Sequence, residues 1–329
     1  MSNYDEGRRL IFVGGAPRSG TTLLQNILDS HEDVAGGPEF DNIPEIVRLR
    51  DRLQKSISNG RTGIFRSQGE VDAHVCSLIE GLLLPFADER KKSFLSEKTP
   101  DNVLVFNQLL KICPKAKFIF VIRDPRAIIA SLMEVGKKAA ALNVAAGPIS
   151  RHVPDAICHV QDCFKAGFDA LRFAPDRILP VVYEELVADP EGRTKKICGF
   201  LGIGWSRDML RPGEKPHAGE AGLDGVFYDS KTYYRNIEKS EVDKWKGKLN
   251  SLQIVRINGA FKDNGDLNRI GYEFTDADIS WPVRFFSQAV TAGGSLAGRG
   301  ISALMGIPPI KNLARRTVLT VRRLSRRYA

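Results

Sequence analysis

The chain has 329 residues, of which 43% are hydrophobic and 26% charged, so it can form one large globular domain, or one domain and an appendage. Its net charge of +9 falls within residues 283–329, which contain nine of the 48 basic and none of the 39 acidic residues; residues 1–282 are therefore neutral, and no nucleic-acid partner is expected. No run reaches the roughly 18 to 20 apolar residues of a membrane span, and the N-terminus lacks the h-region of a signal peptide.

Strands and helices are expected to alternate along the body of the chain. Short apolar runs predict strands at residues 10–13, 117–122 and 178–182. Helices are predicted after each of them, at residues 21–28, 126–135 and 190–201. Apolar residues at helical spacing predict further helices near residues 41–56, 70–86, 101–112, 153–172 and 250–263. This alternation predicts an α/β fold, with a parallel sheet covered by helices on both faces.

The turn after the first strand has the pattern of a phosphate-binding loop. Gly15 and Gly20 supply a GxxxxG frame, in which backbone N–H groups and a helix N-terminus can hold an anion. The next position is Thr21, where a nucleotide triphosphatase has the lysine that reaches a terminal phosphate. This departure argues against a kinase or ATPase. A phosphosulfate is shorter and less charged than a triphosphate, and it could be held by backbone amides, by Ser19, Thr21 and Thr22, and by the cation of Arg18.

A second motif follows the strand at residues 117–122. Arg123 ends this strand, and Ser131 lies eight residues later, about two turns into the next helix. This spacing can bring a guanidinium and a hydroxyl to one phosphate at the carboxyl edge of the sheet, where open α/β folds bind ligands. Alone, this Arg-Asp-Pro-Arg segment is weak evidence, since it also makes a good helix start with an ion pair; paired with the first loop, it is strong evidence for phosphate binding.

These motifs resemble those of sulfotransferases that depend on 3′-phosphoadenosine-5′-phosphosulfate (PAPS), and the detail is most similar to the tyrosylprotein branch. The matching segments are PRSGTTLL (17–24), GPEFDNIPEI (37–46), SEKTP (96–100), FIFVIRDPRAIIAS (118–131), VVYEELV (181–187) and VDKWKGKL (242–249). They occur in the family's order over about residues 10–248. The resemblance implies a sulfotransferase domain with a phosphate-loop-like parallel sheet, which we place at residues 1–282 because the distribution of charge sets residues 283–329 apart as a basic tail.

The resemblance also implies which residues hold the donor. The loop from Pro17 to Thr22 would hold the 5′-phosphosulfate, and Arg123 with Ser131 would hold the 3′-phosphate. Tyr183 and Lys244 would also contact the nucleotide. No metal is implied. Cys158, His159 and Cys163 lie close together but lack a second pair of ligands, and five scattered cysteines favour reduced thiols in a cytoplasmic enzyme.

Catalytic residues follow from the same resemblance. Glu39 falls at the position of the family's carboxylate base, which takes the proton of the acceptor hydroxyl. Lys98 matches the lysine that contacts the bridging oxygen, and Arg18 shares that electrostatic task. Ser230 aligns with a serine of similar role across a one-residue gap. His31 lies near the first loop, but its place at the end of the first helix favours a structural role.

One departure concerns the acceptor. Tyrosylprotein sulfotransferases have a basic residue two positions after the base, and this chain has Asp41 there. A carboxylate would repel an acid-rich peptide, which puts protein tyrosine in doubt; the acceptor classes that stay open are a carbohydrate, a lipid, a small molecule and protein tyrosine. The alternatives to a sulfotransferase are a nucleotide-dependent kinase and a non-catalytic nucleotide-binding protein.

The tail has the pattern of a basic amphipathic helix. At 100° per residue its apolar side chains fall within about 120°, and basic side chains fill the other arc. The apolar set is Ile310, Leu313, Ala314, Val318, Val321, Leu324 and Tyr328, and the basic set is Lys311, Arg315, Arg316, Arg322, Arg323, Arg326 and Arg327. The pattern predicts contact of residues 310–329 with an anionic membrane surface, peripheral at the inner face. Packing on the body, or on another partner, is the alternative.

Overall fold

The computed structural model describes residues 5–217 and 236–275 of the chain. Ser230, the boundary expected at 282/283 and the basic tail lie outside the described residues. Among the helices of the described part, none combines the length and the hydrophobicity needed to cross a bilayer.

Five parallel strands form one sheet in the order β2-β3-β1-β4-β5. The strands are β1 (Leu10–Gly15), β2 (Val34–Gly36), β3 (Phe94–Lys98), β4 (Lys117–Ile122) and β5 (Ile178–Val182). The predicted α/β fold with a parallel sheet is thus confirmed, and the three predicted strands are β1, β4 and β5. The sequence did not reveal β2, which has only three residues, or β3, whose second half (Ser-Glu-Lys) is polar although it is buried.

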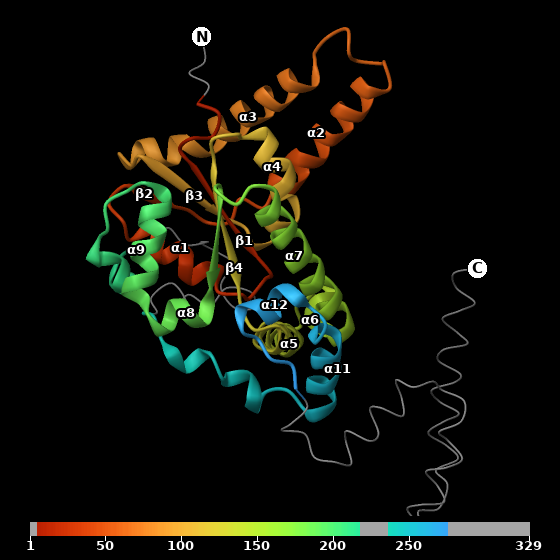
Figure 1. Ribbon diagram of the computed structural model, residues 1–329, viewed down its shortest axis with the longest axis vertical. Coiled ribbons are helices and arrows are strands. Elements are labelled where there is room, and N and C mark those ends of the chain that lie inside the picture. Colours follow the sequence, from red (N-terminus) through yellow and green to blue (C-terminus); the bar gives the residue numbers. More distant parts are fainter. Residues whose placement is uncertain (1–4, 218–235, 276–329) are drawn as a thin grey trace, which may run out of the picture. The chain divides into compact units, whose positions relative to one another are not determined.

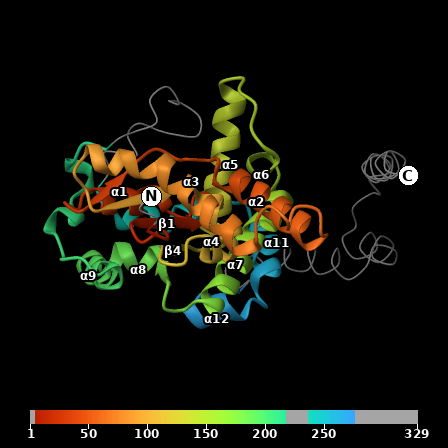
Figure 2. The same ribbon diagram turned by 90° about the horizontal axis from the view of Figure 1, so that it is seen from above.

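Helices cover both faces of the sheet (Figures 1 and 2). The α-helices of the first half are α1 (Thr21–Asp29), α2 (Ile43–Ser58), α3 (Gln68–Glu89), α4 (Phe106–Ile112), α5 (Pro125–Ala141) and α6 (Pro148–Arg151). Those that follow are α7 (Val153–Phe173), α8 (Tyr183–Ala188), α9 (Pro190–Leu201), α11 (Ser251–Phe261) and α12 (Gly265–Ile270). Short 3₁₀ helices are η1 (Pro100–Val105), η2 (Arg207–Leu210), η3 (Pro212–Glu214), η4 (Lys239–Glu241) and η5 (Lys244–Gly247).

The central strand β1 is buried on both faces, and its side chains alternate between two cores. Leu10 and Phe12 belong to the larger core, which includes residues of α3, α4, α5, α7 and α11. Ile11 and Val13 belong to the smaller core, which includes residues of α1, α8 and α9. Because successive side chains of a strand point to opposite faces, a continuous apolar run is what a strand buried on both faces requires.

Two predicted helices differ in detail. The segment expected as one helix at 101–112 begins as the 3₁₀ helix η1, in which the Asn102 N–H bonds to the Thr99 carbonyl at 3.0 Å, and becomes α-helical only at Phe106. After β5 the chain forms α8 before α9. Asp189 separates these two helices, because its side chain accepts a hydrogen bond from the Gly192 N–H and begins α9.

Candidate active site

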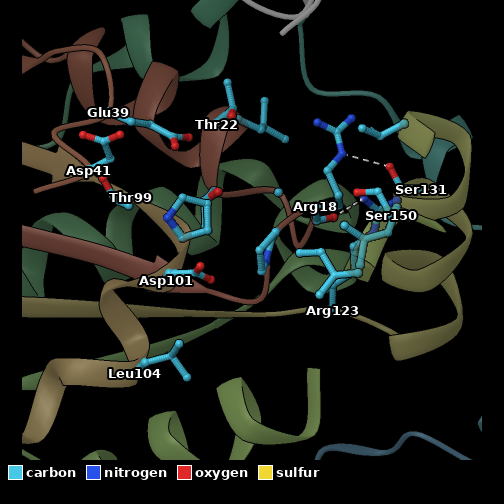
Figure 3. Close-up of a pocket in the computed structure, with 18 of the residues that line it drawn as sticks. Arg18, Thr22, Glu39, Asp41, Thr99, Asp101, Leu104, Arg123, Ser131 and Ser150 are labelled. Atoms are coloured by element: carbon cyan, nitrogen blue, oxygen red, sulfur yellow. Dashed lines mark hydrogen bonds between the residues drawn. The ribbon is translucent and has the colours of Figure 1, made fainter. Parts of the chain in front are cut away.

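The turns that follow β1, β3, β4 and β5 lie at the carboxyl edge of the sheet and bound a cavity of about 860 Å³. Ligands of open α/β folds bind at this edge. Figure 3 shows that the cavity has two chemically different sides. Glu39, Asp41 and Asp101 line one side, and Arg18, Arg123 and Ser131 line the other.

The loop between β1 and α1 has the backbone of an anion-binding turn. Gly20 has a φ of +104°, and a Cβ at this position would lie 2.4 Å from the Tyr183 ring, so only glycine fits. Arg18 also has a positive φ, of 74°. The Ser19 hydroxyl is buried, and within the described residues it has no hydrogen-bond partner. A buried polar group without a partner is costly, and a bound anion would satisfy it.

Arg18, Arg123 and Ser131 come together on the cationic side. The Arg18 Nε donates to the Ser131 Oγ at 3.0 Å. The Arg123 Nη1 donates to the Arg18 carbonyl at 3.2 Å, and its guanidinium lies 4.1 Å from the centre of the Tyr183 ring. The Arg123 Nε is buried and lacks a partner among the described residues. The structure therefore brings the two sequence motifs to one position and leaves the buried Arg123 Nε without a partner among the described residues.

Glu39 and Lys98 form an ion pair on the other side of the cavity. Lys98 is the last residue of β3 and its side chain is only 2% exposed, whereas Glu39 lies in the loop after β2 and lines the cavity. The order of the sheet places β2 beside β3, and this pairing brings two residues 59 positions apart in the chain into contact.

Two buried residues that the sequence analysis did not identify hold the Glu39 loop. The Glu97 carboxylate accepts hydrogen bonds from the Phe40 N–H at 3.2 Å and the Thr99 hydroxyl at 2.7 Å, and also from the Asn102 side chain. Gln25 of α1 donates to the Gly37 carbonyl at 3.3 Å and to the Ser96 carbonyl at 2.8 Å. Polar residues in β3 and in the middle of α1 were the available sequence signal, since buried polar groups need partners.

Burial raises the pKa of Glu97 to about 7. In the unfolded chain this carboxyl has its usual lower pKa, so the folded chain binds the proton more tightly. The free energy of unfolding is therefore expected to decrease as the pH rises from about 5 to about 7. The Glu97 carboxyl accounts for on the order of 3 kcal/mol of this decrease. Urea unfolding of the wild type and of Glu97→Gln at both ends of this range measures the effect. The variant should lack this part of the decline; equal declines in both proteins would contradict the assignment.

Asp101 is held in the cavity wall by His159. The His159 Nε2 lies 3.0 Å from the Asp101 Oδ1 and 3.7 Å from the Cys163 Sγ, and hydrogen bonding to Asp101 raises the pKa of His159. The ligand atoms of these three side chains lie within 4.8 Å of one another. Cys158, which the sequence places next to His159, is exposed and does not belong to this group.

Of the other three residues considered in the sequence analysis, Tyr183 lines the cavity, whereas Lys244 and His31 are not among its lining residues. Tyr183 lines the cavity and packs on the loop after β1. Lys244 is about half exposed, pairs with Glu241 and is not among the residues that line the cavity. His31 is buried at the end of α1, where its Nδ1 accepts from the Asp33 N–H at 3.0 Å and its Nε2 lies 2.6 Å from the Gly204 carbonyl. These two contacts give His31 a structural role away from the cavity.

Comparison with known proteins identifies the family. The profile of the sulfotransferase family matches residues 10–207. Protein-tyrosine sulfotransferase 1 of Danio rerio is 30% identical over 274 residues, which cover 82% of this chain and 74% of the relative. The chain belongs to the sulfotransferase family. It is therefore an enzyme that transfers a sulfuryl group, and PAPS is the donor that membership implies. This result decides against the kinase and the non-catalytic alternatives.

Other comparisons with this sulfotransferase agree. Protein-tyrosine sulfotransferase 2 of Gallus gallus is 29% identical over 264 residues, which cover 75% of this chain and 65% of the relative. Among solved structures, the sulfotransferase domain from the curacin biosynthetic pathway superposes with a TM-score of 0.51 at 19% identity and covers 73% of this chain and 91% of its own. At this identity, the likeness of the structures concerns the fold alone.

Proposed function

We propose that this sulfotransferase moves the sulfuryl group of PAPS to an acceptor hydroxyl, with Glu39 as the base. The observation that supports it is the division of one cavity into a cationic side and a carboxylate side (Figure 3). In the reaction the acceptor oxygen forms a bond to sulfur while the bond from sulfur to the bridging oxygen breaks. The hydroxyl proton goes to Glu39, and 3′,5′-adenosine bisphosphate leaves.

The cationic side would hold the donor. The loop from Pro17 to Thr22 leads into the N-terminus of α1, where backbone N–H groups and the helix dipole favour an anion, and we assign the 5′-phosphosulfate to it. We assign the 3′-phosphate to Arg123 and Ser131. The partnerless Ser19 Oγ and Arg123 Nε support this assignment, because both are buried donors. Tyr183 would orient Arg123 through its ring, and Lys244 would contact the nucleotide by a change of rotamer away from Glu241.

Lys98 and Arg18 would stabilise the charge that develops during transfer. Lys98 is almost fully buried, and a cation in a site shielded from water acts more strongly on nearby charge than it would in solution. Its contact with Glu39 fixes both side chains next to each other. Ser230, which lies outside the described residues, would add a hydrogen bond to the same oxygen.

The acceptor side favours a hydroxyl without acidic neighbours. Asp41 is exposed and lines the cavity together with Glu39 and Asp101. The Asp41 carboxylate would repel the acidic residues around a tyrosine in an acid-rich peptide. We therefore favour a carbohydrate, a lipid or a small molecule over such a tyrosine, although relatives of this chain are named protein-tyrosine sulfotransferases.

Calorimetric titration tests the donor assignment. The purified chain is titrated in parallel with 3′,5′-adenosine bisphosphate, 5′-AMP and ATP. The bisphosphate should bind most tightly. It alone places its 3′-phosphate at Arg123 and Ser131 while its 5′-phosphate occupies the loop from Pro17 to Thr22. Equal or tighter binding of ATP would refute the assignment. Labelled PAPS then serves to screen hydroxyl acceptors of the three classes.

We also propose that residues 310–329 contact an anionic membrane surface. The support is the sequence pattern, an apolar stripe beside seven basic residues. Replacing Arg322, Arg323, Arg326 and Arg327 with glutamine in the full chain should weaken binding to phosphatidylserine-containing vesicles at least tenfold, since each cation near such a surface contributes about 1 kcal/mol. Sedimentation with vesicles measures this. Unchanged binding would favour packing of the tail on the body.

A further inference from the structure

The loop between α2 and α3 presents two large apolar side chains to solvent. Ile64 is 88% exposed and Phe65 is 71% exposed, the two highest values among the large hydrophobic residues of the described chain. Single exposed apolar residues are ordinary on protein surfaces, but two adjacent ones at the end of a helical hairpin are a recognisable interaction feature. Figure 1 shows that this hairpin extends away from the sheet.

Hydrogen bonds give this loop a defined shape. The Arg61 N–H bonds to the Ser56 carbonyl at 3.0 Å, and the Phe65 N–H bonds to the Thr62 carbonyl at 3.0 Å. Ser67 and Glu70 then form a capping box that begins α3. The two apolar side chains therefore project from an ordered turn.

Further contacts brace the two helices behind the loop. Arg50 of α2 makes two hydrogen bonds to Asp72 of α3, at 2.6 and 2.8 Å. Gln54 donates to the Gln68 carbonyl at 2.9 Å, and the Gln68 side chain donates to the Ser58 hydroxyl at 2.9 Å. These hydrogen bonds fix α2 and α3 against each other, so that the loop between them is held away from the sheet.

The same end of the hairpin is basic. Residues 52–69 contain four cations and no acidic residue, although residues 1–282 as a whole are neutral. The four cations are Arg52, Lys55, Arg61 and Arg66, all exposed, and none forms a salt bridge with another described residue. An exposed apolar pair flanked by Arg61 and Arg66 matches the interface of an anionic bilayer, where apolar side chains enter the acyl boundary and cations meet the headgroups.

We propose that the tip of the α2–α3 hairpin, residues 61–66, inserts Ile64 and Phe65 into an anionic lipid surface while Arg61 and Arg66 bind its headgroups. This contact is independent of the tail and of the proposed reaction. Arg48 is the cavity-lining residue farthest along α2, and it precedes Ser58 by ten residues, about 15 Å of helix. The cavity therefore lies away from the inserted tip and stays accessible.

An environment-sensitive fluorophore placed at the tip tests this insertion in the full chain. Cys158 is first replaced with serine, because the other four cysteines are buried. The probe is then attached at Ile64→Cys, or at Lys196→Cys, an exposed position on α9, as a control. With vesicles of mixed phosphatidylcholine and phosphatidylserine, the tip probe should shift to the blue and be quenched by lipid-borne quenchers. The control probe should not respond, and pure phosphatidylcholine vesicles should give no shift at either position.

Substitutions test the two chemical components separately. Arg61→Gln with Arg66→Gln should weaken vesicle binding by about fivefold per arginine. Ile64→Ser with Phe65→Ser should weaken it at least tenfold, whereas Phe173→Ser, which removes a side chain 63% exposed at the end of α7, should not change it. A silent tip probe, or equal responses at both labelled positions, would overturn the proposal. So would a loss of self-association in the Ile64 and Phe65 variant without any change in lipid binding, because the tip would then be a contact between copies of the chain.

Discussion

Replacing Glu39 with glutamine is expected to lower the turnover number by about 10²- to 10⁴-fold, the usual contribution of a general base. Glutamine keeps the size of the side chain and can still accept a hydrogen bond from Lys98, but it cannot take the proton of the acceptor hydroxyl. The affinity for 3′,5′-adenosine bisphosphate should stay within about twofold of the wild type, since Glu39 lies on the other side of the cavity from Arg123 and Ser131 (Figure 3). Steady-state kinetics with labelled PAPS and calorimetry measure the two quantities.

Asp41→Asn is the matched control for this experiment. Asp41 is a carboxylate two residues from Glu39 that also lines the cavity, but it makes no contact with Lys98. Its replacement should change the choice of acceptor more than the turnover number. If Asp41→Asn lost turnover and Glu39→Gln kept it, Glu39 would not be the base.

Arg123→Ala is expected to weaken binding of 3′,5′-adenosine bisphosphate by roughly 10- to 150-fold, the range that corresponds to hydrogen bonds with a charged group. The guanidinium is fixed by the Arg18 carbonyl, the Glu241 carbonyl and the Tyr183 ring, and its buried Nε lacks a partner among the described residues. Loss of this side chain removes a preorganised cation, and the remaining groups cannot replace it.

The companion ligand 5′-AMP shows whether the effect is local. It lacks the 3′-phosphate, so its affinity should be nearly the same in the wild type and in Arg123→Ala. A parallel loss for both nucleotides would mean that Arg123 supports the loop as a whole and does not recognise the 3′-phosphate. Thermal unfolding of the variant, monitored without ligand, separates either effect from a loss of fold.

Local patterns were sufficient for those elements of the fold that carry a long apolar run or a distinctive turn. The buried strands β1, β4 and β5 have five or six residues that are apolar or small, so each has a clear signal. The phosphate-binding loop from Pro17 to Thr22 could likewise be predicted from the sequence, because the glycine positions and the following helix define an anion-binding turn locally. Strand β3 could not be predicted from the sequence. Its Ser96, Glu97 and Lys98 are polar but buried, and a polar sequence normally indicates exposed residues.

The sequence by itself determined the class of fold, the family and the two motifs of the cationic side of the cavity, since each depends on residues close together in the chain. Only the tertiary structure decided how the carboxylate side of the cavity is built. The pairing of β2 with β3 brings Glu39 to Lys98. The buried side chains of Glu97 and Gln25 hold the loop that carries Glu39 by hydrogen bonds, which the sequence pattern does not reveal. The physical reason is that a buried polar side chain is stable only with its partners, and these partners are set by which strands are neighbours in the sheet.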